Sequence, residues 1–60
     1  MLRTVKSKTT GITYQFEYNQ QDEIVYLRMP NGAWIGVGEN VKSYVDAQRI
    51  AQHHVDTQIL

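Results

Sequence analysis

The sequence predicts a small α+β protein, an antiparallel β-meander of three or four strands with one C-terminal helix packed on one face. Asn31-Gly32 lies between two short apolar runs, and this dipeptide favours a two-residue type I′ hairpin turn. Residues 12–18 alternate apolar and polar without a break, which is typical of a strand with one buried face. After Gly38-Glu39-Asn40 the apolar residues recur with helical spacing. We expect residues 1–60 to form a single domain.

Each strand is bounded by turn residues. Residues 12–18 lead into the polar turn 19–22, and residues 23–29 form the next strand. Pro30 has no N–H, so this hairpin end is expected at the edge of the sheet or just beyond the ladder. Residues 33–37 form the following strand. Val5 begins a further strand that turns near residues 9–11 and pairs with residues 12–18.

A helix follows from about residue 43 to the C-terminus. Ser43 with Asp46 three residues later approximates a capping box, although Asn40 could also cap an earlier start. At about 100° per residue one stripe is apolar and is expected to cover the sheet. It contains Val41, Tyr44, Ala47, Ala51, Val55 and Ile59.

The opposite stripe of this helix is polar. It carries Lys42, Asp46, Arg49 and His53, so it is expected to face water. Ala47 and Ala51 are small, which lets the helix approach the sheet closely.

The predicted turns set which side chains share a face. With Asn31-Gly32 as the loop, Met29 faces Trp34 and Tyr26 faces Val37; with 19–22 as the loop, Phe16 faces Val25. Directly opposed residues point to the same side of a sheet. The predicted core face then carries Ile12, Tyr14, Phe16, Tyr18, Val25, Leu27, Met29 and Trp34, together with Gly36 and Gly38.

The other face contains an apolar cluster that no helix is left to cover. An exposed patch of this kind usually marks an interface, although solvent-facing strands also carry such residues for β-propensity, and a register slip would exchange the faces. We expect a non-enzymatic protein-interaction module that binds a protein partner or itself, as a back-to-back homodimer. Its predicted contact centre is Ile24, Tyr26, Ile35 and Val37, with Arg28 and Gln15 at the rim.

Nucleic-acid binding is the alternative. Arg3, Lys6 and Lys8 cluster near the N-terminus, and Lys6 and Lys8 are expected to join Arg28 and Tyr26 on the open face. Glu17 interrupts this patch, and lysines on a strand edge also guard against aggregation. The chain balances six basic with six acidic residues and so lacks the broad positive field of most nucleic-acid binders.

Composition and motifs favour neither an enzyme nor a metal protein. The chain has no cysteine, and Gly36-x-Gly38 lacks the third glycine of a dinucleotide loop. Ser43 is explained as a helix cap. His53 and His54 are adjacent, so on a helix they point about 100° apart and do not share one ion easily. We therefore expect no catalytic residue, cofactor or metal.

No apolar stretch approaches the roughly 20 residues of a membrane span. The first ten residues, MLRTVKSKTT, contain no hydrophobic region of a secretory signal. We expect a soluble, cytoplasmic protein without membrane contact.

Residues from Trp34 to Ala51 carry a resemblance. Trp34-Ile35, followed by Ser43-x-x-Asp46-Ala47-x-x-x-Ala51, resembles small accessory proteins of lambdoid phages and prophages, which implies binding to a host protein. The layout is also similar to the arm-site DNA-binding domain of tyrosine recombinases and to the antitoxin of HicAB systems. Those recombinase domains are usually basic, whereas this chain is neutral, and the antitoxins carry a separate DNA-binding segment.

Overall fold

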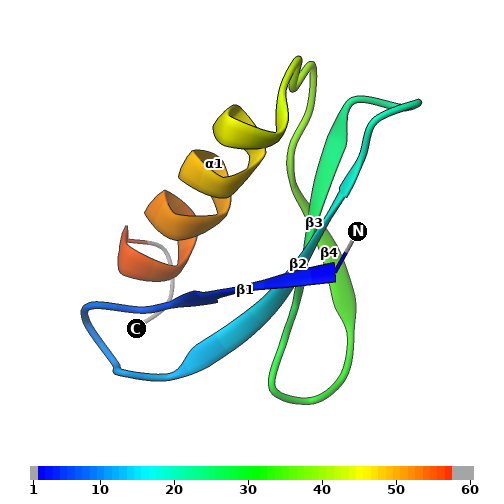
Figure 1. The fold of residues 1–60 in the computed structure, drawn as a ribbon. Helices are drawn as coiled ribbons and strands as arrows, with labels where there is room; N and C mark the ends of the chain where they lie inside the picture. The colour runs from blue at the N-terminus through cyan, green and yellow to red at the C-terminus, as the bar shows by residue number, and fades with distance from the viewer. Residues whose placement is uncertain (1, 58–60) are drawn as a thin grey trace.

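A computed structural model describes residues 2–57, which form a four-stranded antiparallel sheet with one helix across one face (Figure 1). The strands follow in the sheet in chain order, so the predicted α+β meander is confirmed with the fourth strand included. The elements are β1 (Leu2–Lys6), β2 (Thr13–Asn19), β3 (Ile24–Arg28), β4 (Trp34–Gly38) and α1 (Tyr44–Thr57).

The first hairpin confirms a strand before residues 12–18, but this strand spans Leu2–Lys6 and so begins before the predicted start at Val5. Val5 pairs with Tyr14, and both side chains are buried. The turn closes where Ser7 N–H donates to the Ile12 carbonyl at 2.9 Å and Gly11 N–H donates to the Ser7 carbonyl at 2.9 Å. Gly11 has a φ of 77°, which glycine adopts at little cost. Ile12 was expected in the core but is 48% exposed, because it lies in this turn before β2 begins.

The β2–β3 register differs from the prediction by two residues. Phe16 pairs with Leu27, not Val25, because Asn19 belongs to β2 and the turn spans residues 20–23. The Asn19 side chain accepts a hydrogen bond from Asp22 N–H at 3.2 Å, and Glu23 takes a φ of 59°. A shift of two residues keeps each side chain on its face. The predicted core residues of β2 and β3 are therefore correct.

The β3–β4 register differs from the prediction by one residue, and a shift of one residue exchanges the two faces of β4. Met29 N–H donates to the Ala33 carbonyl at 2.7 Å, and Gly32 N–H donates to the Met29 carbonyl at 2.8 Å. The loop therefore contains Pro30, Asn31 and Gly32, and of these only Gly32 has a positive φ, 91°. This is the three-residue hairpin loop in which a turn is followed by a left-handed residue. Pro30 favours it because its fixed φ suits the first central position of the turn.

The one-residue shift moves Trp34 out of the predicted core. Trp34 pairs with Arg28 and is 42% exposed on the face away from the helix. Ile35 pairs with the buried Leu27 and so lies on the helix side, 38% exposed, contrary to the prediction. An irregularity between Val25 and Tyr26 then restores the predicted parity, so Gly38 pairs with Val25.

The helix confirms the predicted cap and most of the buried stripe. The Ser43 hydroxyl accepts a hydrogen bond from Asp46 N–H at 3.2 Å, as an N-cap does. Ala47, Ala51 and Val55 are fully buried, whereas Ile59 lies outside the described residues. The polar stripe is exposed as predicted. The buried hydrophobic residues are Val5, Tyr14, Phe16, Val25, Leu27, Val41, Ala47, Ala51 and Val55.

The last helical turn is joined to the β1–β2 turn. The Ser7 hydroxyl, 1% exposed, donates to the Val55 carbonyl at 2.8 Å. The Thr9 hydroxyl donates to the Asp56 carbonyl at 2.7 Å, and Lys8 N–H donates to Asp56 Oδ1 at 2.8 Å. The last carbonyls of a helix have no partner within it, and these contacts supply partners.

Candidate binding surfaces

The open face of the sheet is the face that α1 does not cover. Its central strand β3 presents Ile24, Tyr26 and Arg28, and β4 contributes Trp34 and Gly36 opposite them. Of the predicted contact residues, Ile24, Tyr26, Arg28 and Gln15 share this face. Hereafter the open-face cluster means Ile24, Tyr26, Arg28, Trp34 and Gln15.

Arg28 links three strands of this face. Its Nη1 donates to Gln15 Oε1 on β2 at 3.2 Å, and its guanidinium lies 5.9 Å from the centre of the Trp34 ring on β4. A cation near an exposed aromatic face contributes about 0.5–1 kcal/mol. The contacts hold the indole beside the guanidinium, so an aromatic surface and a fixed positive charge are presented together.

Gly36 forms the floor of a shallow hollow beside Tyr26. A Cβ built at Gly36 would lie 3.9 Å from both the Ile24 and Tyr26 side chains, which is ordinary contact distance. The hollow is lined by Ile24, Tyr26, Gly36, Val37, Gly38 and Glu39. Because Gly36 has no side chain, a protruding group of a partner can reach the backbone of β4 here.

Two predicted contact residues do not belong to the open-face cluster. Ile35 lies on the helix side, and Val37 is half-buried at the irregular part of β4, where it packs against the core. Trp34, which the two-residue loop placed in the core, belongs to the cluster instead. The signal for it in the sequence was Pro30, whose preference for the first central turn position lengthens the loop by one residue.

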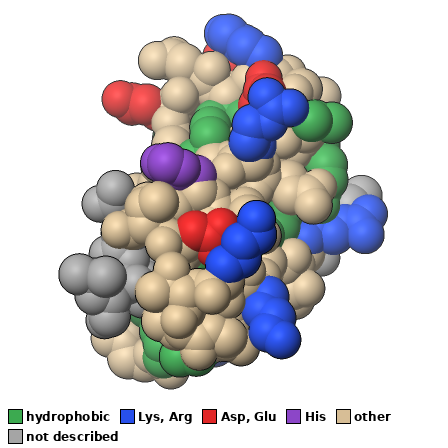
Figure 2. Space-filling view, turned by 90° about the vertical axis from the view of Figure 1, so that its left-hand side faces the viewer, with side chains coloured by type: hydrophobic (Ala, Val, Ile, Leu, Met, Phe, Trp, Pro, Cys, Tyr) green, Lys and Arg blue, Asp and Glu red, His purple; other side chains and the backbone are tan. Residues whose placement is uncertain are grey.

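The residues of the nucleic-acid alternative are dispersed. Lys6 pairs with Thr13 on the open face as predicted, whereas the Arg3 guanidinium lies on the helix side, 5.6 Å from the Tyr44 ring centre. Lys8 lies in the β1–β2 turn beside Asp56, not on the open face. Figure 2 shows the helix side, where acidic and basic side chains are interspersed without a large patch of either sign.

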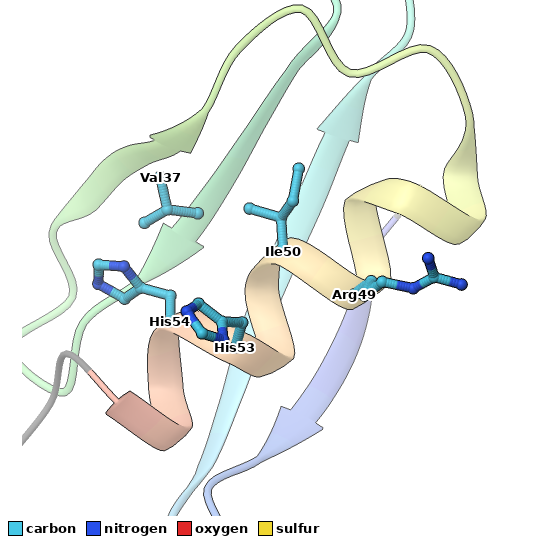
Figure 3. Close-up of a pocket in the computed structure, with 5 residues that line it drawn as sticks. All are labelled: Val37, Arg49, Ile50, His53 and His54. Atoms are coloured by element: carbon cyan, nitrogen blue, oxygen red, sulfur yellow. The ribbon is translucent and has the colours of Figure 1, made fainter.

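A second concave surface lies between β4 and α1 (Figure 3). It is lined by Val37, Arg49, Ile50, His53 and His54, which we call the edge groove. Val37 and Ile50 come from the facing elements and form its apolar part, with His54 beside Val37. The side chain of Arg49 points away from Val37. Sequence reasoning missed this groove because it treated Arg49 and His53 simply as a water-facing stripe.

Within residues 2–57 no group of three or more His, Cys, Asp or Glu side chains is arranged to hold a metal ion. The pKa of Asp56 is lowered, chiefly by the hydrogen bond from Lys8 N–H and further by Gln52 and by the charges of Lys8 and His53, against partial desolvation. This carboxylate is a structural tether at the helix end.

Over the same residues, no helix is both long enough and apolar enough to cross a membrane. Comparisons with protein-family models, with curated proteins and with solved structures found no match to this chain.

Proposed function

We propose that the chain is a non-enzymatic protein-interaction module that binds a protein partner through the open-face cluster. The observation that carries this proposal is Trp34, 42% exposed on the uncovered face beside Tyr26 and stacked near Arg28. Tryptophan, tyrosine and arginine are the residues enriched at the energetic centres of protein interfaces. The resemblance to phage accessory proteins adds that such a partner is a protein of a host cell.

The size of the face limits the strength of the contact. The Cα trace measures 30 × 20 × 16 Å, so even its broadest outline, about 600 Å², is smaller than the roughly 800 Å² that each partner contributes to a standard interface. We therefore expect self-association to be weak, and a partner that reaches beyond the sheet to bind more tightly.

Trp34 is the one tryptophan of the chain, so its fluorescence reports on this face. The test combines light scattering with Trp34 emission over a series of protein concentrations. We expect the mass to rise toward that of a dimer, with emission shifting to shorter wavelength as the indole loses water. Tyr26→Glu should stay monomeric and folded, whereas Gln48→Glu, exposed on the helix side, should behave as the parent chain.

A chain that stays monomeric with unchanged emission contradicts self-association and leaves a different protein as the partner. A photo-crosslinking residue at position 26, with position 48 on the exposed helix side as control, then identifies it in a cell extract. Equal crosslinking from both positions would contradict the proposed surface.

Single-stranded nucleic acid is the second candidate, and the position of Trp34 favours it. Tyr26 and Trp34 lie on an open sheet face that also carries Arg28 and Lys6, and aromatic and basic residues of this kind bind bases by stacking and phosphates by charge. Titration with a labelled 12-nucleotide oligothymidylate, followed by Trp34 quenching, separates the two functions. Affinity that falls steeply with salt supports nucleic acid, whereas absence of quenching at low salt contradicts it.

A further inference from the structure

The Asn31-Gly32 pair in the exposed β3–β4 loop is open to a reaction between its own two residues. The side-chain amide of an asparagine can be attacked by the main-chain nitrogen of the next residue, which closes a five-membered succinimide ring. A following glycine hinders this approach least, because it has no side chain. Asn19 and Asn40, the other asparagines of the chain, are followed by larger residues. Asn31 is therefore the asparagine whose neighbour favours loss of the amide.

The loop holds the Asn31 side chain close to the Gly32 backbone. Asn31 Oδ1 accepts a hydrogen bond from Ala33 N–H at 3.0 Å. This Asx turn bends the side chain back across the backbone of Gly32. The same N–H is placed to stabilise the negative charge that develops on Oδ1 during attack, as a donor of an oxyanion hole does. The loop therefore both positions and activates the side-chain carbonyl.

The attacking nitrogen is held by one hydrogen bond. Gly32 N–H donates to the Met29 carbonyl at 2.8 Å, and this bond must open before the reaction. Asn31 and Gly32 are exposed, and hydrogen bonds in exposed loops open at little cost. Arg28 Nη2 lies 3.8 Å from the Cβ position of Gly32, so a positive charge lies beside the residue that must lose a proton. A nearby opposite charge favours the deprotonated form.

We propose that Asn31 is a site of spontaneous deamidation and that the carboxylate formed there draws Arg28 away from Trp34. First, the Gly32 nitrogen gives its proton to solvent and bonds to Asn31 Cγ, the Cγ–Nδ2 bond breaks, and ammonia leaves with a proton taken from water. Water then adds to one carbonyl of the succinimide, the C–N bond of that carbonyl breaks, and the glycine nitrogen regains its proton. The product is aspartate or isoaspartate, and the net reaction consumes one water and releases one ammonium ion.

The new carboxylate competes for the Arg28 side chain. In the amide form the guanidinium lies 5.9 Å from the Trp34 ring centre, and Nη1 donates to Gln15 Oε1 at 3.2 Å. The carboxylate forms on the residue next to Gly32, which the same guanidinium already approaches. A guanidinium bonds a carboxylate more strongly than it bonds a neutral amide. Deamidation should therefore shift Arg28 from the indole toward the loop.

This movement changes the open-face cluster. The positive charge that lay beside Trp34 is neutralised by the new carboxylate, and the chain gains one negative charge. The expected loss of binding rests on the proposed function, since it requires that the cluster is the surface that binds a partner. The deamidation and the movement of Arg28 need no partner, so they can be tested without one.

The first test follows the purified full chain during incubation at physiological pH and temperature. Peptide mass spectrometry measures the conversion of amide to carboxylate at each asparagine, and released ammonia is measured in the same samples. We expect Asn31 to react at least about tenfold faster than Asn19 or Asn40, which corresponds to about 1.4 kcal/mol in activation free energy. Asn31→Gln keeps the amide but needs a larger ring, so residue 31 should stay intact.

The role of Arg28 in the reaction has its own matched pair. Arg28→Lys keeps the positive charge and should deamidate at the rate of the parent chain. Arg28→Gln removes the charge and should react more slowly. Equal rates in the two variants would contradict assistance by this charge.

The movement of Arg28 is tested with Asn31→Asp, which carries the new charge from the start. In the parent chain the ring current of Trp34 shifts the NMR resonances of the Arg28 side-chain protons. We expect this shift to shrink in Asn31→Asp and in aged protein. Gln48→Glu adds the same charge on the exposed helix side and should leave the shift unchanged.

Two outcomes would overturn the proposal. The first is an amide at residue 31 that persists as long as those at residues 19 and 40. The second is a ring-current shift of Arg28 that is the same in Asn31→Asp and in the parent chain. Where Arg28 moves but crosslinking from position 26 is as strong as in the parent chain, the binding role of Arg28 and Trp34 is contradicted while the deamidation stands.

Discussion

The ideal Cβ position of Gly38 lies 2.8 Å from Ile50 Cγ2, closer than side-chain carbon atoms can approach. The contact joins the end of β4 to the middle of α1. It fixes how closely the helix rests on the sheet, and with it the position of the edge groove.

Gly38→Ala should therefore lower the free energy of unfolding by about 1–3 kcal/mol, as overpacking does. Val25 Cγ1, at 3.1 Å from the same position, leaves little room for the methyl group to move aside. Urea denaturation measures the effect. Gly36→Ala is the matched control, since its Cβ would meet neighbours at 3.9 Å, and it should change stability little. In an Ile50→Ala background the penalty at residue 38 should shrink, and an undiminished penalty would contradict this contact.

Ser7→Ala should lower the free energy of unfolding by about 1–3 kcal/mol, because it leaves buried polar groups unpaired. The Ser7 hydroxyl donates to the Val55 carbonyl at 2.8 Å and accepts from Thr9 and Thr10 N–H at 3.2 and 3.1 Å. Hydrogen exchange should show faster exchange in the β1–β2 turn and the last turn of α1. Thr13→Ala, exposed on β2, is the control, and an equal loss there would assign the effect to strand propensity.

From the conformation of the β3–β4 loop we predict that alanine substitutions at its last two residues lower the stability of the fold by unequal amounts. Gly32 has a φ of 91°, so Gly32→Ala should cost about 1–2 kcal/mol. Asn31 does not have a positive φ, and Asn31→Ala loses one exposed hydrogen bond to Ala33 N–H at 3.0 Å, about 0.5 kcal/mol. Thermal or urea unfolding measures both. Equal costs would indicate a type I′ turn, which requires a positive φ at both residues.

The ionisation of Asp56 should make the stability of the fold depend on pH in the acidic range. The hydrogen bond from Lys8 N–H lowers the pKa of this carboxyl in the folded chain, so its stabilising contribution is complete above the ordinary pKa. The contribution is lost as the pH falls through the lowered pKa, in the window below about pH 4. The stability difference between the parent chain and Asp56→Asn should shrink across that window. The Lys8 amide resonance should titrate with it, and a difference that is constant with pH would contradict the tether.

The faces of β2 and β3 were predictable because their alternation is strong enough to survive an error in the turn. Phe16 and Leu27 are buried although the predicted partner of Phe16 was two residues away. The face of Trp34 was not predictable. A loop one residue longer exchanges the two faces of β4, and the glycines of this strand leave no clear alternation of apolar and polar side chains from which to assign its faces.

The two candidate surfaces also differ in how far they could be predicted from the sequence. Tyr26 and Arg28 follow from the alternation of one strand and were found on the open face as expected. The edge groove depends on the angle at which α1 crosses β4, and that angle is set by contacts such as Gly38 with Ile50. Ser7, a buried serine before a turn, had no sequence pattern that distinguished it from an exposed one.

The bonds from residues 7–9 to residues 55–56 span 47 or 48 positions, so they determine the order in which the chain can fold. During synthesis on the ribosome, the first hairpin is made early but has no anchor until the last helical turn emerges. Contacts of this separation slow folding relative to a helical protein of equal length. The nascent chain therefore cannot form these bonds until residues 55 and 56 have left the ribosome, and a chain that ends before them would lack the bonds that hold the β1–β2 turn to α1.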